Sequence, residues 1–367
     1  MPQLDGLRCF AVIAVMVHHN WRPDEPWLFD RLNWGDLGVR LFFVLSGFLI
    51  TGILLGGITG RESDRPERMV FLRNFYARRF LRIVPVYYFV LLVLIVNRAQ
   101  PTEDLPWLAT FTTNIYIWLR LDWIDYPHLW TLAVEEQFYL VWPWLVLFLR
   151  RSWLLPALVA LISLGPLYRL FATFQYPEDT GFGGSSASLI FPLGVVDSLG
   201  LGALLALAFA ADPDGKRLSG VLTRVVLPMG VALFVLTRTK LVLGDHAVTA
   251  LGDLSSALIF CWLVGMAARG FPGIAGRLLE WGPIRYVGKI SYGAYLFHLL
   301  VPYLLLAPLV DRFGGTYENK GLVNFVVTSL LTIGIAALSW HLFEAPINRL
   351  RHFFPYRAAR AVPGRPS

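Results

Sequence analysis

A potential catalytic base lies at the far end of the first apolar stretch of the chain. Residues 4–19 are strongly apolar but include Arg8, His18 and His19. On a helix that rises about 1.5 Å per residue, Arg8 and His19 are roughly 16 Å apart, about half of a hydrocarbon core of about 30 Å. Histidine exchanges a proton near neutral pH, so either histidine is a general base or an interfacial residue that only binds water or a loop. Neighbours on a helix point about 100° apart, so the two cannot share one role.

A second group of residues is basic and suits phosphate binding. Residues 69–88 contain Arg73, Arg78, Arg79 and Arg82, interleaved with aromatic side chains and followed by an apolar run. Arg79 and Arg82 are three residues apart and share a helix face. Paired guanidinium groups bind phosphates through two parallel hydrogen bonds. The alternative is a juxtamembrane cluster that meets anionic lipid head groups.

The third group is acidic and enters an apolar helix. Glu135 and Glu136 follow His128 within residues 128–144, HLWTLAVEEQFYLVWPW. A carboxylate in an apolar span is costly unless it is paired or protonated. These glutamates therefore either pair with an arginine or take part in acid–base chemistry, where one of them orients the catalytic histidine.

Further polar residues stand in later apolar stretches. Ser46 either lines a site or allows helices to pack closely, and Tyr292 and His298 add a hydroxyl and a second histidine to one span. Asp197 and Asp253 are acidic residues within spans that have no evident local partner. No cluster has metal-ligand spacing, and neither a phosphate-binding glycine loop nor a Gly-x-Ser-x-Gly elbow is present.

The composition predicts the scaffold that positions these residues. The chain has 367 residues, of which 56% are hydrophobic and only 16% charged, with 13 tryptophans. Soluble domains carry about 25% charged residues, so we predict an all-α, polytopic transmembrane bundle. Apolar runs of about 20 residues predict about ten spans, at 6–20, 38–58, 83–97, 132–149, 153–172, 188–210, 221–238, 247–268, 287–309 and 321–343.

Charge placement predicts the orientation. With both termini in the cytoplasm, most Lys and Arg residues fall in cytoplasmic segments, as the positive-inside rule requires. The net charge of +7 is then a sign of topology, and nucleic-acid binding is not expected. We expect residues 1–350 to form the transmembrane domain and residues 351–367 to form a basic, disordered cytoplasmic tail.

Taken together, the motifs resemble the acyltransferase-3 family of integral membrane acyltransferases. The similar pieces run in order from residue 4 to residue 349, namely LDGLRCFAVIAVMVHH, GVRLFFVLSGFLIT, FYARRFLRIVPVYY, HLWTLAVEEQFYLVWP, ISYGAYLFH and FEAPINR. Thr131 and Ala133 stand where many members have serines. We expect a stand-alone member without the extracytoplasmic hydrolase-like domain that is fused to some members.

The resemblance implies transfer of an acyl group, usually acetyl, from acyl-CoA to a hydroxyl of a sugar-containing or other small acceptor. Its first-helix pattern selects His19 over His18, with Glu135 and Glu136 as the other catalytic candidates. CoA binding is expected at Arg79, Arg82 and Arg73, with no metal. Support for the substrate or the structure is expected from Arg8, Ser46, Tyr139, His128, Tyr292 and His298.

The expected acceptors are surface polysaccharide, lipid-linked glycan or a macrolide-type antibiotic. The expected location is the cytoplasmic membrane of a bacterium. The alternative function is a proton-coupled transporter or flippase that uses Asp197 and Asp253. An enzyme consumes acyl-CoA when an acceptor is present, whereas a transporter does not.

Overall fold

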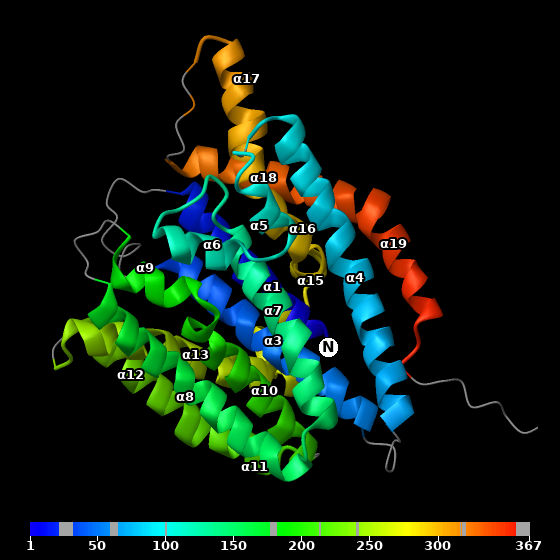
Figure 1. Cartoon of the computed structure of the whole chain (residues 1–367), viewed down its shortest axis with the longest axis vertical. Coiled ribbons are helices and arrows are strands. Elements are labelled where there is room, and N and C mark those ends of the chain that lie inside the picture. Colours follow the sequence, from blue (N-terminus) through cyan, green and yellow to red (C-terminus); the bar gives the residue numbers. More distant parts are fainter. Residues whose placement is uncertain are drawn as a thin grey trace, which may run out of the picture.

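The structure of the chain is a computed structural model, and it is all-helical in every part that it describes. It describes residues 1–21, 32–58, 65–99, 101–176, 182–212, 214–239, 242–315, 317 and 321–356. In Figure 1, α1, α3 and α7 run through the middle, with α4 and α19 on one side and α8, α12 and α13 on the other. The helices of the first half are α1 (Pro2–Asn20), α3 (Trp34–Ile58), α4 (Arg65–Val96), α5 (Leu105–Ala109), α6 (Thr113–Arg120), α7 (Leu129–Phe148) and α8 (Arg151–Gln175).

The second half contains more interrupted helices. Pro192 and Gly194 lie where α9 gives way to α10, and α16 and α17 belong to a pair bent by 50° around His298. The elements are α9 (Gly183–Ile190), η2 (Pro192–Gly194), α10 (Val196–Ala211), α11 (Lys216–Val221), η3 (Leu222–Val226), α12 (Leu227–Thr239), α13 (Asp245–Arg269), α14 (Gly273–Leu279), α15 (Gly282–Lys289), α16 (Ser291–Phe297), η4 (Val301–Leu306), α17 (Ala307–Arg312), α18 (Gly321–Ser339), η5 (Trp340–Glu344), α19 (Ala345–Arg349) and η6 (Leu350–Phe353).

Six helices of the described chain are long and apolar enough to cross a membrane, or seven if the bent pair is one span. All ten predicted spans fall on helices, but α1 and α7 are not among the six, since each carries several polar side chains. The predicted span 188–210 is divided by η2, and α10 alone has only 16 residues. The helical, multi-pass architecture is thus confirmed, whereas the count of ten and the orientation stay predictions.

One long helix replaces a predicted loop and span. The apolar pattern predicts a span only at 83–97, after the arginine-rich residues that begin at Arg73. Instead, α4 is a continuous helix of 32 residues with Pro85 inside it. Proline is tolerated in membrane helices when neighbouring groups compensate for the lost hydrogen bond. The arginine-rich half of α4 is therefore part of the bundle.

The C-terminal end of the described chain packs on α4. The Nδ2 of Asn74 donates to the carbonyl of Pro355 over 2.6 Å, and the Arg78 guanidinium lies 4.4 Å from the centre of the Tyr356 ring. The predicted tail of residues 351–367 therefore begins within η6. Residues 357–367 lie outside the described residues, so the division into domain and tail stays a prediction.

Two glycines allow α3 and α10 to pack closely against each other. Gly47 on α3 lies against the backbone of Leu199 on α10, and Gly202 on α10 lies against the backbone of Val44. A side chain at either glycine would collide with main-chain atoms, so both positions require the small residue.

On α1, Arg8 and His19 are eleven residues apart, which is close to three full turns, and they share one face. The α1 helix thus presents both groups toward its neighbours at different depths.

Candidate active site

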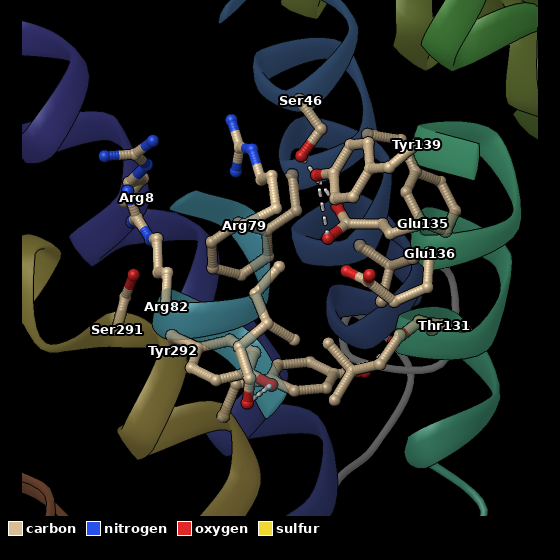
Figure 2. Close-up of a pocket in the computed structure, with 16 residues that line it drawn as sticks. Arg8, Ser46, Arg79, Arg82, Thr131, Glu135, Glu136, Tyr139, Ser291 and Tyr292 are labelled. Carbon is tan, nitrogen blue, oxygen red and sulfur yellow. Dashed lines mark hydrogen bonds between the residues drawn. The ribbon is translucent and has the colours of Figure 1, made fainter. Parts of the chain in front are cut away.

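A polar cavity lies between α1, α3, α4, α7 and α16 and encloses about 90 Å³. Figure 2 shows arginines on one side of it and carboxylates on the other. We call it the polar cavity. Its lining residues are Arg8, Val39, Phe42, Phe43, Ser46, Arg79, Arg82, Ile83, Thr131, Leu132, Glu135, Glu136, Tyr139, Ser291, Tyr292 and Tyr295.

The acidic wall of the cavity comes from α7. Glu135 accepts a hydrogen bond of 2.7 Å from the Ser46 hydroxyl on α3 and one of 3.3 Å from the Tyr139 hydroxyl one turn further along α7. Glu136 also lines the cavity. Two donors therefore hold the Glu135 carboxyl in place, and Ser46 takes part in the site as well as in helix packing.

The basic wall comes from α1 and α4. Arg8 is paired with Asp5 at 3.0 Å, and the Arg79 guanidinium lies over the Tyr139 ring at 5.1 Å from its centre. Within the described chain, neither Arg79 nor Arg82 has a carboxylate within 4.0 Å. Both guanidinium groups line the polar cavity, Arg79 half-buried and Arg82 exposed. These two arginines are therefore available to bind an anionic ligand.

A hydrogen-bonded pair of hydroxyl groups, from Thr131 and Tyr295, lines the polar cavity. The Thr131 and Tyr295 hydroxyls are 2.6 Å apart, and each also lies 3.0 Å from the carbonyl oxygen of His128. Both residues are buried. They connect α7 with α16 at the boundary between the polar cavity and a group of histidines.

His19, His128 and His298 form this group, which we call the histidine cluster. The ring centres of His19 and His298 are 5.1 Å apart, and those of His128 and His298 are 4.8 Å apart. His128 directly precedes α7 and is seven residues before Glu135, or about 10 Å along the helix axis. The site therefore has two levels, with arginines and glutamates at one and histidines at the other.

Backbone contacts fix the tautomers of two of these histidines. The Nδ1 of His298 lies 2.6 Å from the carbonyl of Tyr295, and the Nε2 of His128 lies 3.3 Å from the carbonyl of Leu296. A carbonyl only accepts, so a neutral imidazole places its N–H there and its lone pair on the other nitrogen. Those other atoms, His298 Nε2 and His128 Nδ1, are buried and have no hydrogen-bond partner in the described structure. The cluster thus holds two unused acceptors beside His19.

The histidine cluster is not arranged as a metal site. Within the described residues, no group of three or more His, Cys, Asp or Glu side chains could hold a metal ion. The two fixed lone pairs are instead suited to accept a hydrogen bond from an N–H or O–H group.

The structure assembles most of the residues singled out from the sequence, but in two groups. The polar cavity is lined by Arg8, Ser46, Arg79, Arg82, Glu135, Glu136, Tyr139 and Tyr292, and the histidine cluster contains His19, His128 and His298. Arg73 lines neither; it is exposed and lies 3.4 Å from the Oδ1 of Asn74. The catalytic and binding roles of all these residues stay predictions.

One geometric expectation needs revision. The sequence led us to expect Glu135 or Glu136 beside His19, where it would orient the imidazole. The structure instead surrounds Glu135 with Ser46 and Tyr139, while the His19 ring contacts His18 and His298. The reason is depth, since α7 presents Glu135 about two turns away from the level of His128.

Three contributors to the site were not among the candidate site residues of the sequence analysis. Thr131 and Tyr295 lie on the same helix faces as Glu135 and His298, at spacings of three or four residues, and this periodicity was the available signal. Gln137 donates to the carbonyl of Phe111 and to Asn114 Oδ1, over 2.9 and 2.8 Å. In the motif Glu-Glu-Gln, the glutamine thus fastens α7 to α6 and leaves the glutamates in the cavity.

The two acids of the transporter alternative are paired elsewhere. Asp197 lies 2.7 Å from Arg169, and Asp253 lies 2.7 Å from Arg40. Arg169 also lies 3.6 Å from Asp253, which joins them into one buried network. Arginine therefore neutralises both carboxylates inside the bundle. The proton-relay hypothesis assumed that these two acids lack a partner, and the structure provides one for each.

Comparisons with known proteins bear on the whole chain. A family model described as an acyltransferase domain matches residues 1–341. O-acetyltransferase OatA of Staphylococcus aureus is 28% identical over an alignment that covers 95% of this chain and 57% of that protein. Peptidoglycan O-acetyltransferase OatA of Listeria monocytogenes is also 28% identical, with 95% and 56% covered. YrhL of Bacillus subtilis is 27% identical, with 95% and 55% covered.

The chain spans little more than half the length of these curated relatives. No solved structure gives a significant match.

Proposed function

The chain belongs to the acyltransferase family matched over residues 1–341, and from this we propose that it is a membrane-embedded O-acyltransferase. It transfers an acyl group from acyl-CoA to a hydroxyl of a carbohydrate or a glycosylated small molecule, and acetyl is the acyl group proposed. The observation that carries this proposal is the two-level site, in which Arg79 and Arg82 have no carboxylate within 4.0 Å among the described residues at one level, and His19 lies at the other. The relatives from Staphylococcus aureus and Listeria monocytogenes, which are named as O-acetyltransferases, support it.

The proposed reaction begins with the donor. Arg79 and Arg82 bind the anionic phosphates of acyl-CoA through charge-assisted hydrogen bonds. The flexible pantetheine arm then carries the thioester past Thr131 and Tyr295 toward the histidine cluster. Glu135 and Glu136 keep the cavity polar and balance the charge of the arginines.

His19 then acts as the general base. It takes the proton of the acceptor hydroxyl while the hydroxyl oxygen attacks the acyl carbon. The carbon–sulfur bond breaks, the ester forms, and His19 returns the proton to the thiolate to give free CoA. A route through a transient acyl-histidine has the same overall balance, and trapping of acyl-His19 without acceptor distinguishes the two.

The test of this function is CoA release by the purified protein. We expect acetyl-CoA to be consumed only when a suitable acceptor is present, from a panel of peptidoglycan fragments, polysaccharide oligomers and macrolides. Mass spectrometry of the acceptor should show one added acetyl group. Donor binding without any release across the whole panel, together with transport of one of these compounds in liposomes, would favour a carrier instead.

We propose that His298 positions His19 within this mechanism. The Nε2 lone pair of His298, which has no partner in the described structure, is proposed to accept a hydrogen bond from the His19 imidazole when substrate is bound, so that the other nitrogen of His19 faces the acceptor hydroxyl as the base. Asparagine at 298 retains a donor for the Tyr295 carbonyl but lacks an acceptor at the Nε2 position, whereas glutamine places an amide oxygen there. We expect His298→Asn to lower kcat roughly 10- to 100-fold, and His298→Gln to retain most of the activity.

The comparison uses kcat and its pH profile for both variants at saturating donor. The two substitutions are close in size, so a purely structural role predicts similar losses from each. Equal losses in the two variants, with an unchanged pH profile, would remove His298 from the mechanism.

We further propose ten membrane passages, with both termini in the cytoplasm of a bacterium. The distribution of Lys and Arg supports this topology. A cysteine at Thr102 should then react with an impermeant maleimide in intact cells, whereas one at Ser152 should react only after permeabilisation. The native Cys9 and Cys261 are buried and free, so background labelling should be low. Labelling of Ser152→Cys in intact cells would contradict this orientation.

A further inference from the structure

A second pocket lies between α3, α9, α12 and α13, apart from the polar cavity and the histidine cluster. It encloses about 180 Å³, against about 90 Å³ for the polar cavity, and one water molecule needs only about 10–15 Å³ of such space. The pocket therefore has room for a ligand of several heavy atoms. We call it the α3–α13 pocket, and its polar lining residues are Asp36, Ser188, Thr237, Arg238, Thr249 and Asp253.

Two charged groups of this pocket have no hydrogen-bond partner in the part of the chain that the structure describes. The Asp36 carboxylate accepts no hydrogen bond there, and its one ion pair, with Arg40, has a distance of 3.9 Å. The Arg238 guanidinium has no carboxylate within 4.0 Å, lies 5.1 Å from the centre of the Phe234 ring, and has a buried Nε without a partner. Opposite charges attract strongly in a weakly polar setting. Two such groups that line one pocket without pairing are therefore available to a ligand between them.

The α13 wall of the pocket adds further hydrogen-bonding capacity. Asp253 meets Arg40 at 2.7 Å and Arg169 at 3.6 Å through the same oxygen, Oδ2, so its Oδ1 has no partner among the described residues. The Thr249 hydroxyl, one turn earlier, also makes no hydrogen bond within those residues. Gly252 lies between them, and a Cβ built there would meet no neighbouring group within 4 Å. A pocket with acceptors and donors on its walls suits a ligand rich in hydroxyl groups, such as a sugar ring.

The α3–α13 pocket and the histidine cluster lie at the same end of the bundle, on two sides of the first turn of α3. Gly35 packs on His18, since a Cβ at Gly35 would lie 2.7 Å from atoms of that ring, and the next residue, Asp36, lines the pocket. His18 is exposed and His19 is half-buried, so a large acceptor can reach the end of α1. A helix with its side chains is about 10–12 Å wide, which a short glycan chain spans and a single sugar ring does not. In the topology proposed above, this end faces the outside of the cell.

We propose that the α3–α13 pocket binds one sugar of a glycan acceptor while another sugar of the same chain presents its hydroxyl to His19. This inference rests on the proposed function, and it assigns the acceptor to oligosaccharides or polysaccharides rather than to single sugars or macrolides. The two carboxylates accept hydrogen bonds from the hydroxyls of the bound sugar, whereas Arg238 and Thr249 donate to its oxygens. Transfer itself is unchanged, because acyl-CoA still reaches His19 from the arginine level, the ester forms and CoA is released.

The test compares single sugars with tetrasaccharides, both prepared from peptidoglycan and from a bacterial polysaccharide, at saturating acetyl-CoA. We expect the wild type to use the tetrasaccharides with a kcat/KM roughly tenfold higher or more, since each hydrogen bond in the pocket strengthens binding severalfold. Gly252→Phe should fill the pocket. It should raise the KM for the tetrasaccharide roughly tenfold or more, and change kcat/KM for the single sugar less than about threefold. Arg238→Met, which removes a donor at similar size, should raise the tetrasaccharide KM by roughly three- to tenfold.

Gly334→Phe is the matched control, because Gly334 also lies within a helix with open space at its Cβ but does not line the α3–α13 pocket. It should leave the use of both acceptor sizes unchanged. Equal use of single sugars and tetrasaccharides by the wild type would overturn the inference while leaving the proposed function intact. Equal losses with both sizes in Gly252→Phe, together with an unchanged tetrasaccharide KM in Arg238→Met, would overturn it as well. If no acceptor of either size supports consumption of acetyl-CoA, the proposed function itself is contradicted.

Discussion

Replacing His19 with alanine should lower kcat for acyl transfer roughly 100- to 10,000-fold, the range for loss of a general base. The donor should still bind, because Arg79 and Arg82 lie at the other level of the site. We would measure CoA release at saturating acyl-CoA and acceptor, together with the dissociation constant of CoA for the same preparation. A low kcat with unchanged CoA affinity would assign His19 to the chemical step.

The neighbouring histidine provides the control. His18 is more exposed than His19, and its ring meets that of His19 at 4.9 Å, nearly at right angles. Because it points about 100° away around the helix, His18→Ala should change kcat less than threefold. Similar losses in both variants would indicate damage to the end of α1, and unimpaired transfer by His19→Ala would direct attention to His128 and His298.

Much of the site could be predicted from the sequence, because helical periodicity depends only on residues that are near one another in the chain. The eleven-residue spacing of Arg8 and His19 already implied one shared face. The three-residue spacing of Arg79 and Arg82 likewise placed both on the cavity side of α4. Arg73 is six residues before Arg79, which places it about 120° around the helix from Arg79, and this difference could also have been predicted.

Partners across helices could not be predicted in the same way. Nothing in the run around Thr131 names Tyr295 as its contact, since the two are 164 residues apart. The separation of Glu135 from His19 has the same origin, because the relative depth of two helices depends on packing that a single chain does not display. Helix breaks are a further case, as the apolar run 188–210 looks continuous but is divided at Pro192 and Gly194.

The second large effect is expected at the arginine level of the site. Arg79→Ala should raise the KM for acetyl-CoA roughly 10- to 100-fold, because a charge-assisted hydrogen bond to phosphate is lost from a partly buried site. Arg82→Ala should act in the same direction. Arg79→Lys should be intermediate, since lysine retains the charge but cannot form the two parallel hydrogen bonds of a guanidinium.

Arg73→Ala is the matched control. It removes the same residue type from the same helix, but Arg73 is exposed, does not line the polar cavity and contacts Asn74. Its KM for acetyl-CoA should stay within about twofold of the wild type. A loss comparable to that of Arg79→Ala would mean that the phosphates bind along the outer part of α4, as the sequence alone led us to expect for Arg73.

A donor without phosphates decides what the arginines bind. S-acetylpantetheine has the thioester and most of the arm of acetyl-CoA but neither the pyrophosphate nor the 3′-phosphate. If Arg79 and Arg82 hold those phosphates, the wild type and the alanine variants should use this donor with similar kcat/KM, and the defect should appear only with acetyl-CoA. If the variants lose as much with S-acetylpantetheine, the arginines act on the thioester. Because the arginines line the polar cavity together with Glu135 and Glu136, that cavity, rather than the histidine level, would then be the place where the acyl group reacts.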